Sequence, residues 1–348
     1  MATRAEYRID VIAGDGIGRE VVPAAISCID TLADKHEFRV HWQHRDWGSD
    51  YYRAHGRMMP TDGLDQLAKG DGVFLGAVGV PDIPDTETLW GLLIPIRRSF
   101  HQYVNLRPVR TLPGVRSPLR GGDELDLVIV RENVEGEYSE VGGRLYQGRP
   151  EEAAVQESIF TRAGVARIAR YAAQLAASRK GVLTSATKSN GIVHTMPFWD
   201  EVVAEHAGEV RLDSVLIDAL AARLVLQPSS VDVIVASNLF GDILSDLAAG
   251  VAGSIGVAPS GNINPEREFP SMFEPVHGSA PDIAGQGVAN PTGQLWAGAM
   301  MLEHLGQPAA AAQLERAFAA ALADGVRTAD LGGEAGTEEF TAAVLDRL

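Results

Sequence analysis

Two aspartates four residues apart are the feature of this sequence that most directly suggests chemistry. Asp242 and Asp246 lie in Asn238–Ala248, a segment with the apolar pattern of a buried helix. Side chains at i and i+4 share one helical face, so two carboxylates there repel each other unless a cation lies between them. Mg²⁺ and Mn²⁺ bind carboxylate oxygens, which predicts a metal site. The alternative is a pair of solvated charges near a helix N-terminus, where negative charge is favoured.

Other reactive side chains also follow strand-like segments. The aspartate pair comes after the apolar run Val231–Ser237, and ligands of open α/β sheets bind beyond such strand ends. Asp218 follows another apolar run and could add a third carboxylate to the metal site. Lys188 follows a third run, where a depressed pKa would suit a general base; the alternative is a surface lysine. Tyr138 is a candidate proton donor or a half-buried loop aromatic.

Three arginines are candidates for binding an anionic substrate. Arg97 directly follows the apolar segment Leu92–Ile96. Arg107 lies in Asn-Leu-Arg-Pro, and Arg131 follows an apolar strand. Guanidinium groups bind carboxylates through two hydrogen bonds, so converging arginines suit a di- or tricarboxylate. The alternative for each arginine is an ion pair with a nearby acidic side chain.

Two glycine-rich segments suggest a nucleotide site. Gly14–Gly18 follows a strand and opens a helix, but its spacing is one residue short of the dinucleotide fingerprint. Glu274–Gly285, followed by Asn290, has small residues that let a ligand approach the backbone. Asp282 could bind ribose hydroxyls and would repel a 2′-phosphate, which favours NAD over NADP. His277 taken alone is more typical of a loop histidine.

Composition excludes several classes of protein. The 348 residues carry a net charge of −16, whereas nucleic-acid binding needs a basic surface. The single cysteine, Cys28, lies in an apolar helical pattern, so neither a disulfide nor a cysteine-based zinc site is expected. No apolar run approaches the roughly 20 residues of a membrane span, and the N-terminus lacks a signal-peptide pattern. We therefore expect a cytoplasmic protein that binds neither nucleic acid nor membrane.

Strand-like and helix-like segments alternate, which favours an α/β fold with helices on both faces of a sheet. The expected strands are Tyr7–Ala13, Gly72–Leu75, Leu125–Val130, Gly181–Thr184, Leu212–Ile217 and Val231–Ser237. The clearest helices are Gly18–Ala33, Arg162–Ser178, Leu295–Leu305, Ala309–Ala323 and Thr337–Leu348.

Taken together, these segments resemble the β-decarboxylating dehydrogenases of isocitrate, 3-isopropylmalate and tartrate/D-malate. The matching motifs occur in family order along nearly the whole chain: Gly14–Gly18, Asn105–Pro108, Val130–Asn133, Asn238–Ala248, Glu274–Gly285, Leu331–Gly333 and Gly336–Thr337. The resemblance implies the isocitrate/isopropylmalate dehydrogenase-like α/β fold, which has two domains and is not a true Rossmann fold. Its discontinuous first domain would comprise residues 1–102 and 256–348 on the cofactor side. Residues 103–255 would form the substrate, metal and dimerisation domain.

The resemblance also implies a homodimer whose active sites lie between the domains and are completed across the subunit interface. Arg97, Arg107 and Arg131 would hold the substrate carboxylates. Asp242 and Asp246 would bind Mg²⁺ or Mn²⁺ with Asp218 from the second subunit. Lys188, also from the second subunit, would accept the hydroxyl proton, and Tyr138 would protonate the carbanion carbon after CO₂ leaves. NAD would be bound by His277, Gly278, Ser279, Ala280, Asp282, Ile283 and Asn290. A requirement for a monovalent cation stays open.

The segment Asp85–Arg97 bears on the substrate. Isopropylmalate enzymes have one residue fewer between the double leucine and the arginine, and no tryptophan matching Trp90. Isocitrate enzymes carry a serine and an asparagine where this chain has Leu92, Leu93 and Ile94. A bulky indole fits a substrate with a small substituent. The resemblance is therefore greatest to tartrate/D-malate dehydrogenases, and D-malate with activity on tartrate is the expected substrate. The alternatives are 3-isopropylmalate dehydrogenase and a catalytically silent binding protein on the same scaffold.

Overall fold

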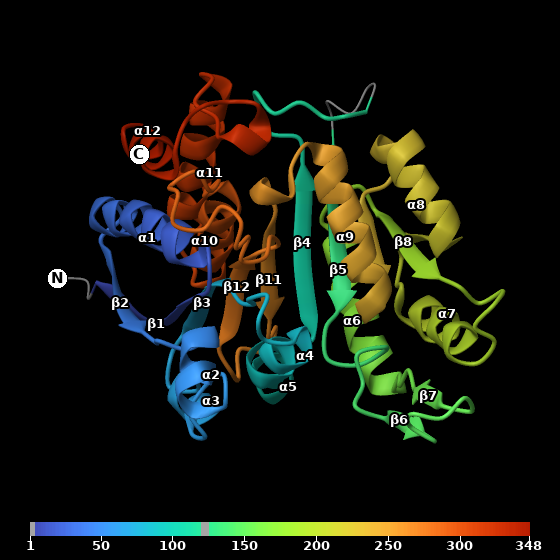
Figure 1. Cartoon of the computed structure of the whole chain (residues 1–348). Coiled ribbons are helices and arrows are strands. Elements are labelled where there is room, and N and C mark those ends of the chain that lie inside the picture. Colours follow the sequence, from blue (N-terminus) through green and yellow to red (C-terminus); the bar gives the residue numbers. More distant parts are fainter. Residues whose placement is uncertain (1–3, 120–124) are drawn as a thin grey trace. The chain divides into compact units, whose positions relative to one another are not determined.

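Strands and helices alternate, as expected, in both units into which the chain divides (Figure 1). The structure, a computed structural model, describes residues 4–119 and 125–348. Unit 1 is made of the described residues of Met1–Gln102, Arg110–Glu124 and Ala249–Leu348. Unit 2 is made of Tyr103–Val109 and Leu125–Ala248. Both units are thus discontinuous in sequence.

Unit 1 is built on strands in the order β2-β1-β3-β12-β11. Strand β1 pairs in parallel with β2 and β3, β3 pairs in parallel with β12, and β12 pairs antiparallel with β11. Every residue of β3 and β12 is buried, as in sheets covered on both faces. The strands are β1 (Ala5–Gly14), β2 (Phe38–His44), β3 (Gly72–Ala77), β11 (Pro259–Ile263) and β12 (Ser271–Pro275).

The helices of unit 1 pack against these strands and one another. The longer ones are α1 (Gly18–Lys35), α10 (Thr292–His304), α11 (Pro308–Ala323) and α12 (Thr337–Leu345). Cys28 is fully buried in α1, which confirms its packing role. Short helices are α2 (Ser49–His55), α3 (Gly63–Leu67), α4 (Asp85–Thr88), α5 (Ile94–Ser99) and the 3₁₀ turns Ile255–Val257 and Ala329–Leu331.

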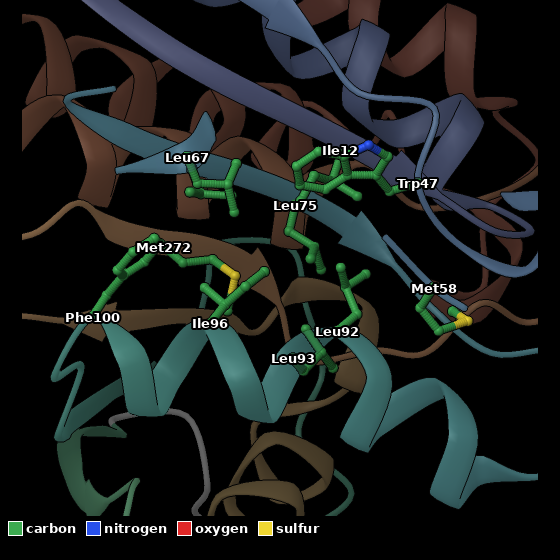
Figure 2. Close-up of a cluster of buried hydrophobic side chains, with 11 residues drawn as sticks. Ile12, Trp47, Met58, Leu67, Leu75, Leu92, Leu93, Ile96, Phe100 and Met272 are labelled. Atoms are coloured by element: carbon green, nitrogen blue, oxygen red, sulfur yellow. The ribbon is translucent and has the colours of Figure 1, made fainter. Parts of the chain in front are cut away.

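A π-helical turn, Leu89–Leu93, connects α4 to α5. Leu92, Leu93 and Ile96 project from this turn and α5 into an apolar cluster that includes Ile12 of β1 and Leu75 of β3 (Figure 2). Burial of these side chains anchors the segment to the sheet by the hydrophobic effect. The anchored segment carries Trp90 and Arg97, so their backbone positions are set by the core of unit 1.

Unit 2 is built on strands in the order β4-β5-β10-β8-β9. The pairs β5–β10, β10–β8 and β8–β9 are parallel, so their carboxyl ends lie at one edge of the sheet. The elements are β4 (Val104–Arg110), β5 (Asp126–Glu132), α6 (Arg162–Ala177), β8 (Val182–Thr187), α7 (Thr195–His206), β9 (Arg211–Leu216), α8 (Ile217–Leu226), β10 (Val233–Ala236), α9 (Asn238–Ala252) and the 3₁₀ turn Pro228–Ser230. Strands β6 (Gly142–Leu145) and β7 (Ala153–Gln156) form a separate antiparallel pair.

Candidate active site

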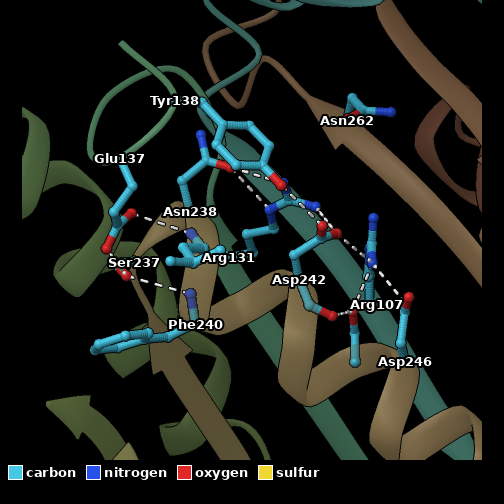
Figure 3. Close-up of polar contacts among 12 residues, drawn as sticks. Arg107, Arg131, Glu137, Tyr138, Ser237, Asn238, Phe240, Asp242, Asp246 and Asn262 are labelled. Carbon is cyan, nitrogen blue, oxygen red and sulfur yellow. Dashed lines mark hydrogen bonds and ion pairs between the residues drawn. The ribbon is translucent and has the colours of Figure 1, made fainter. Parts of the chain in front are cut away.

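Arg131, at the carboxyl end of β5, is the centre of a polar cluster in unit 2 (Figure 3). Its side chain is only 2% exposed. The guanidinium donates through Nη1 to Asp242 Oδ1, and through Nε and Nη2 to Asn238 Oδ1 at 3.1 and 2.7 Å. The Tyr138 hydroxyl donates to Asp242 Oδ2 at 3.1 Å, and the Arg131 Cζ lies 5.5 Å from the Tyr138 ring centroid. The end of β5, the loop that follows it and α9 thus bring together three predicted residues, Arg131, Tyr138 and Asp242.

Arg107 of β4 joins the same cluster, where its side chain lies between those of Asp242 and Asp246 (Figure 3). Its Nη1 donates to Ser245 Oγ and lies 3.2 Å from Asp242 Oδ1 and 3.4 Å from Asp246 Oδ1. Its Nε is buried and has no hydrogen-bond partner among the described residues, so the guanidinium retains a donor for an anion. An anion site was expected for the arginines, with local ion pairs as the alternative, and the ion pairs are present.

The two aspartates remain accessible while the arginines are buried. The side chains of Asp242 and Asp246 are 33% and 54% exposed. Partial burial raises the pKa of the Asp246 carboxyl, Arg107 opposes the rise, and the neighbouring Asp242 charge adds to it. The contribution of Asp242 is the like-charge repulsion expected from the i, i+4 spacing, and a divalent cation would relieve that repulsion.

Close packing of α9 on β5 depends on a glycine. A Cβ atom at Gly241 would lie 2.6 Å from both Cβ and Cγ of Arg131. Such a contact is too short for carbon atoms, so any larger residue would displace the arginine or the helix. Gly241 therefore allows Asp242 to lie within hydrogen-bonding reach of Arg131.

Lys188 and Asp218 form a second polar group in unit 2. They follow β8 and β9, whose parallel register pairs Thr187 with Leu216. The Lys188 Nζ lies 2.6 Å from Asp218 Oδ1, and this hydrogen bond lowers the pKa of the Asp218 carboxyl. Within residues 4–119 and 125–348, no group of three or more histidine, cysteine, aspartate or glutamate side chains could hold a metal ion. The described residues thus bring the carboxylates of Asp242 and Asp246 to one face of α9, and the Asp218 carboxylate pairs with Lys188.

The remaining candidate substrate residues lie in unit 1. Arg97 is 9% exposed, and its Nη2 donates to Glu274 Oε1 at 2.8 Å. Trp90 is half-buried in the π-helical turn, and the Arg98 guanidinium lies over its ring, 4.9 Å from the centroid. Glu274 was not singled out as a partner of Arg97, because the two are 177 positions apart and only the fold brings them together.

The predicted cofactor residues also lie in unit 1, on the loop between β12 and α10. The backbone carbonyl of Ser279 accepts from the Ile17 amide at 2.9 Å, and a Cβ at Gly16 would lie 1.9 Å from that carbonyl oxygen. Gly16 has a φ of +52°, so glycine is required for the conformation and for the close approach. Asn290 accepts from the Thr292 amide, which begins α10.

His277 has a buried ring nitrogen that is available to a bound ligand. Its Nδ1 lies 3.0 Å from the Gly278 carbonyl, which requires the proton on Nδ1 and leaves Nε2 as an acceptor. Burial lowers the pKa of His277, so the ring is neutral. The buried Nε2 has no partner among the described residues, which fits a hydrogen bond from a bound cofactor. Gly278, Ala280, Asp282 and Ile283 complete the predicted set on the same loop.

Glu132, next to Arg131 in the sequence, is buried, and its titration should affect the stability of the protein. Burial raises the pKa of its carboxyl to about 7, although Oε2 accepts from the Val134 and Glu135 amides. The folded protein therefore binds a proton that the unfolded chain releases between about pH 4.5 and 7, so stability falls as pH rises through that window. Glu132→Gln keeps an acceptor oxygen but cannot ionise.

The quantity of interest is the unfolding free energy of Glu132→Gln minus that of the native protein. We expect this difference to increase by on the order of 3 kcal/mol from about pH 5 to about pH 8. Urea denaturation at both pH values measures this difference. Parallel pH dependence in the two proteins would contradict the assignment.

Comparisons with known proteins match nearly the full length of this chain to one family. The sequence model of the family described as isocitrate/isopropylmalate dehydrogenase matches residues 8–344. A probable tartrate dehydrogenase/decarboxylase of Agrobacterium vitis is 53% identical, over 99% of this chain and 98% of that protein. The D-malate dehydrogenase (decarboxylating) of Escherichia coli strain K12 is 51% identical over 97% of each chain. The crystal structure of isocitrate dehydrogenase from Methylococcus capsulatus matches with a TM-score of 0.89 and 33% identity, covering 98% of this chain and 99% of that one. No helix among the described residues has the length and apolarity to cross a membrane.

Proposed function

This chain belongs to the isocitrate/isopropylmalate dehydrogenase family, and from that premise we propose that it oxidatively decarboxylates D-malate to pyruvate and CO₂, with activity on tartrate. Membership confirms the predicted resemblance and fold class. Dehydrogenases of this family generally use NAD and a divalent metal and act on small acids with more than one carboxylate. The relatives that match at about half identity are named for tartrate and D-malate, which supports these substrates.

The arginine–aspartate cluster of unit 2 is the observation that carries the proposal. Buried guanidinium groups suit the substrate's carboxylates, and exposed carboxylates on α9 suit Mg²⁺ or Mn²⁺. A divalent cation bound there would supply Lewis-acid stabilisation of the enolate that forms as CO₂ leaves.

Each remaining residue has a role that matches its chemistry. Arg97, Arg107 and Arg131 orient the substrate carboxylates. Lys188 accepts the hydroxyl proton, and Tyr138 donates a proton to the carbon that CO₂ leaves. Bound NAD would supply the acceptor for the hydride from C2. His277, Asn290 and the loop 278–283 bind NAD, and the exposed Asp282 disfavours the 2′-phosphate of NADP.

We propose a homodimer in which Lys188 and Asp218 complete the site of a second copy. Two observations support it. In the described part of the chain the aspartate pair lacks a third acidic, histidine or cysteine ligand. Unit 2 also exposes apolar side chains that a partner would cover: Val141 (49%), Leu145 (58%), Tyr146 (62%), Leu226 (77%) and Ile243 (52%). The cytoplasmic location stays a prediction.

The decisive assay measures NADH formation by the purified protein with NAD and Mn²⁺. D-malate, L-tartrate and 3-isopropylmalate are compared at equal concentrations. We expect the largest kcat/KM for D-malate or tartrate. A preference for 3-isopropylmalate would move the protein to the alternative, 3-isopropylmalate dehydrogenase of leucine biosynthesis, with the same catalytic residues.

Trp90 is proposed to narrow the substrate pocket. Trp90→Ala should lower the preference for D-malate over 3-isopropylmalate by roughly 10- to 100-fold, because removal of the indole opens space for an isopropyl group. The ratio of the two kcat/KM values measures the effect. Trp42→Ala is a matched control, since Trp42 belongs to β2 and donates to the surface residue Asp30. An unchanged ratio in Trp90→Ala would exclude the pocket role.

A further inference from the structure

The loop that carries Tyr138 is attached to the start of α9 by a carboxylate. Glu137 Oε1 accepts from Ser237 Oγ at 2.7 Å, and Glu137 Oε2 accepts from the Leu239 amide at 3.0 Å (Figure 3). The Leu239 amide belongs to the first turn of the helix, where amides lack intrahelical partners and the dipole favours a negative charge. The Glu137 carboxylate therefore provides a hydrogen-bond acceptor for the Leu239 amide and also attaches the loop to the helix.

The loop contains little regular structure, so its position depends on hydrogen bonds made by side chains. Residues 133–139 have neither helix nor strand, apart from an isolated bridge between Gly136 and Ile159. Asn238 Nδ2 donates to the Glu135 carbonyl at 3.1 Å, which adds a second attachment to α9. Glu137 is the residue immediately before Tyr138, so its attachment limits the movement of the phenol most directly.

The same helix supplies the group that the phenol faces. Tyr138 OH lies 3.1 Å from Asp242 Oδ2, and Asp242 is one turn beyond Asn238 on α9. The loop is thus bonded to the first turn of α9, and the phenol is bonded to the second turn. The position of the proton donor relative to Asp242 and Arg131 is therefore set by bonds to α9.

We propose that Glu137 is a positioning residue that holds Tyr138 in place to protonate the substrate carbon. This inference rests on the proposed role of Tyr138 as the proton donor. In that step the phenol O–H bond breaks, a C–H bond forms at the enolate carbon, and the phenolate regains its proton from water. Misplacement of a donor by about 1 Å can cost as much as 10²-fold in rate, so loss of the anchor should slow this step specifically.

Glu137→Ala should lower kcat for D-malate about tenfold with KM changed less than about twofold, because only proton donation is impaired. The solvent deuterium isotope effect on kcat should rise as that step becomes rate-limiting. Glu137→Gln should recover most of the activity, since its amide oxygen can still accept from the Leu239 amide. Ser139→Ala is the matched control: Ser139 lies just beyond Tyr138, but its hydroxyl donates to the Glu157 carbonyl and not to α9.

A double-mutant cycle separates positioning from general loss of structure. In the Tyr138→Phe background, Glu137→Ala should lower kcat by less than a further factor of about two, because a phenyl ring has no hydroxyl proton to donate. Equal loss in both backgrounds, or an unchanged isotope effect, would overturn the inference and identify Glu137 as a structural cap of α9. Thermal unfolding and Mn²⁺ titration of each variant measure that structural contribution.

The cycle also distinguishes this inference from the proposed function. Full activity in Tyr138→Phe would refute the proton-donor role itself. A strong defect in Tyr138→Phe together with full activity in Glu137→Ala would refute only the positioning role.

Discussion

Asp242→Asn should weaken Mn²⁺ binding by at least roughly 10²-fold and lower kcat/KM for D-malate by about 10³-fold, because the amide has one oxygen and no charge for the cation. Isothermal titration with Mn²⁺ and steady-state assays with NAD measure the two effects. The substitution should alter the arginines less than a deletion of the side chain would, since Asn Oδ1 can still accept from Arg131.

Asp126→Asn is the matched control for loss of a negative charge in unit 2. Asp126 begins β5, at the opposite end from Arg131, and its exposed carboxylate pairs with Arg179. Near-native Mn²⁺ affinity and turnover are expected there. If Asp242→Asn bound Mn²⁺ as tightly as the native protein, the metal would have to bind elsewhere.

Lys188→Met should lower kcat by about 10³-fold while leaving Mn²⁺ binding near native, because the variant loses a general base and no metal ligand. Asp218 loses its ion-pair partner, yet its carboxylate remains. Lys180→Met is the matched control, since Lys180 is an exposed lysine just before β8. Steady-state rates on D-malate give the comparison.

Mixing the two inactive variants tests whether sites are shared between subunits. When Lys188→Met and Asp242→Asn chains are refolded or expressed together, a mixed dimer with shared sites has one intact site and one doubly altered site. Random pairing makes half of the dimers mixed, so about a quarter of native activity should return. Failure to recover activity, with mixed dimers shown to be present, would mean that each site is built from one chain.

The sequence was sufficient to predict the elements whose pattern is local. Strand β10 and helix α9 were expected because a β-branched run precedes a helical repeat, and both are present. The helix α6 was likewise expected, and it begins at Arg162, directly after Thr161, whose side chain accepts from the Gly164 amide. Strands β2, β4, β6, β7, β11 and β12 were not predicted. Of these, β6 and β7 are short, exposed and without an alternating pattern.

Contacts between distant segments were beyond sequence reasoning. The pairing of Lys188 with Asp218 depends on the parallel register of β8 and β9. The bonds of Glu137 to α9 join residues about a hundred positions apart, and no propensity signals them. The π-helical turn at Leu89–Leu93 was missed because propensities do not distinguish π from α turns; it directly precedes the segment where the resemblance has an additional residue.

Under the proposed function, both ligands would have to break the ion pairs that Arg107 and Arg131 make with the α9 aspartates. A divalent cation that takes the aspartates frees the guanidinium groups, and a dicarboxylate that takes the guanidinium groups frees the aspartates. Each ligand thus lowers the cost of binding the other, and thermodynamic linkage requires the two enhancements to be equal. The two arginines and two aspartates together carry no net charge, so either ligand alone would leave the cluster charged, whereas a divalent cation and a dicarboxylate bound together would keep it neutral.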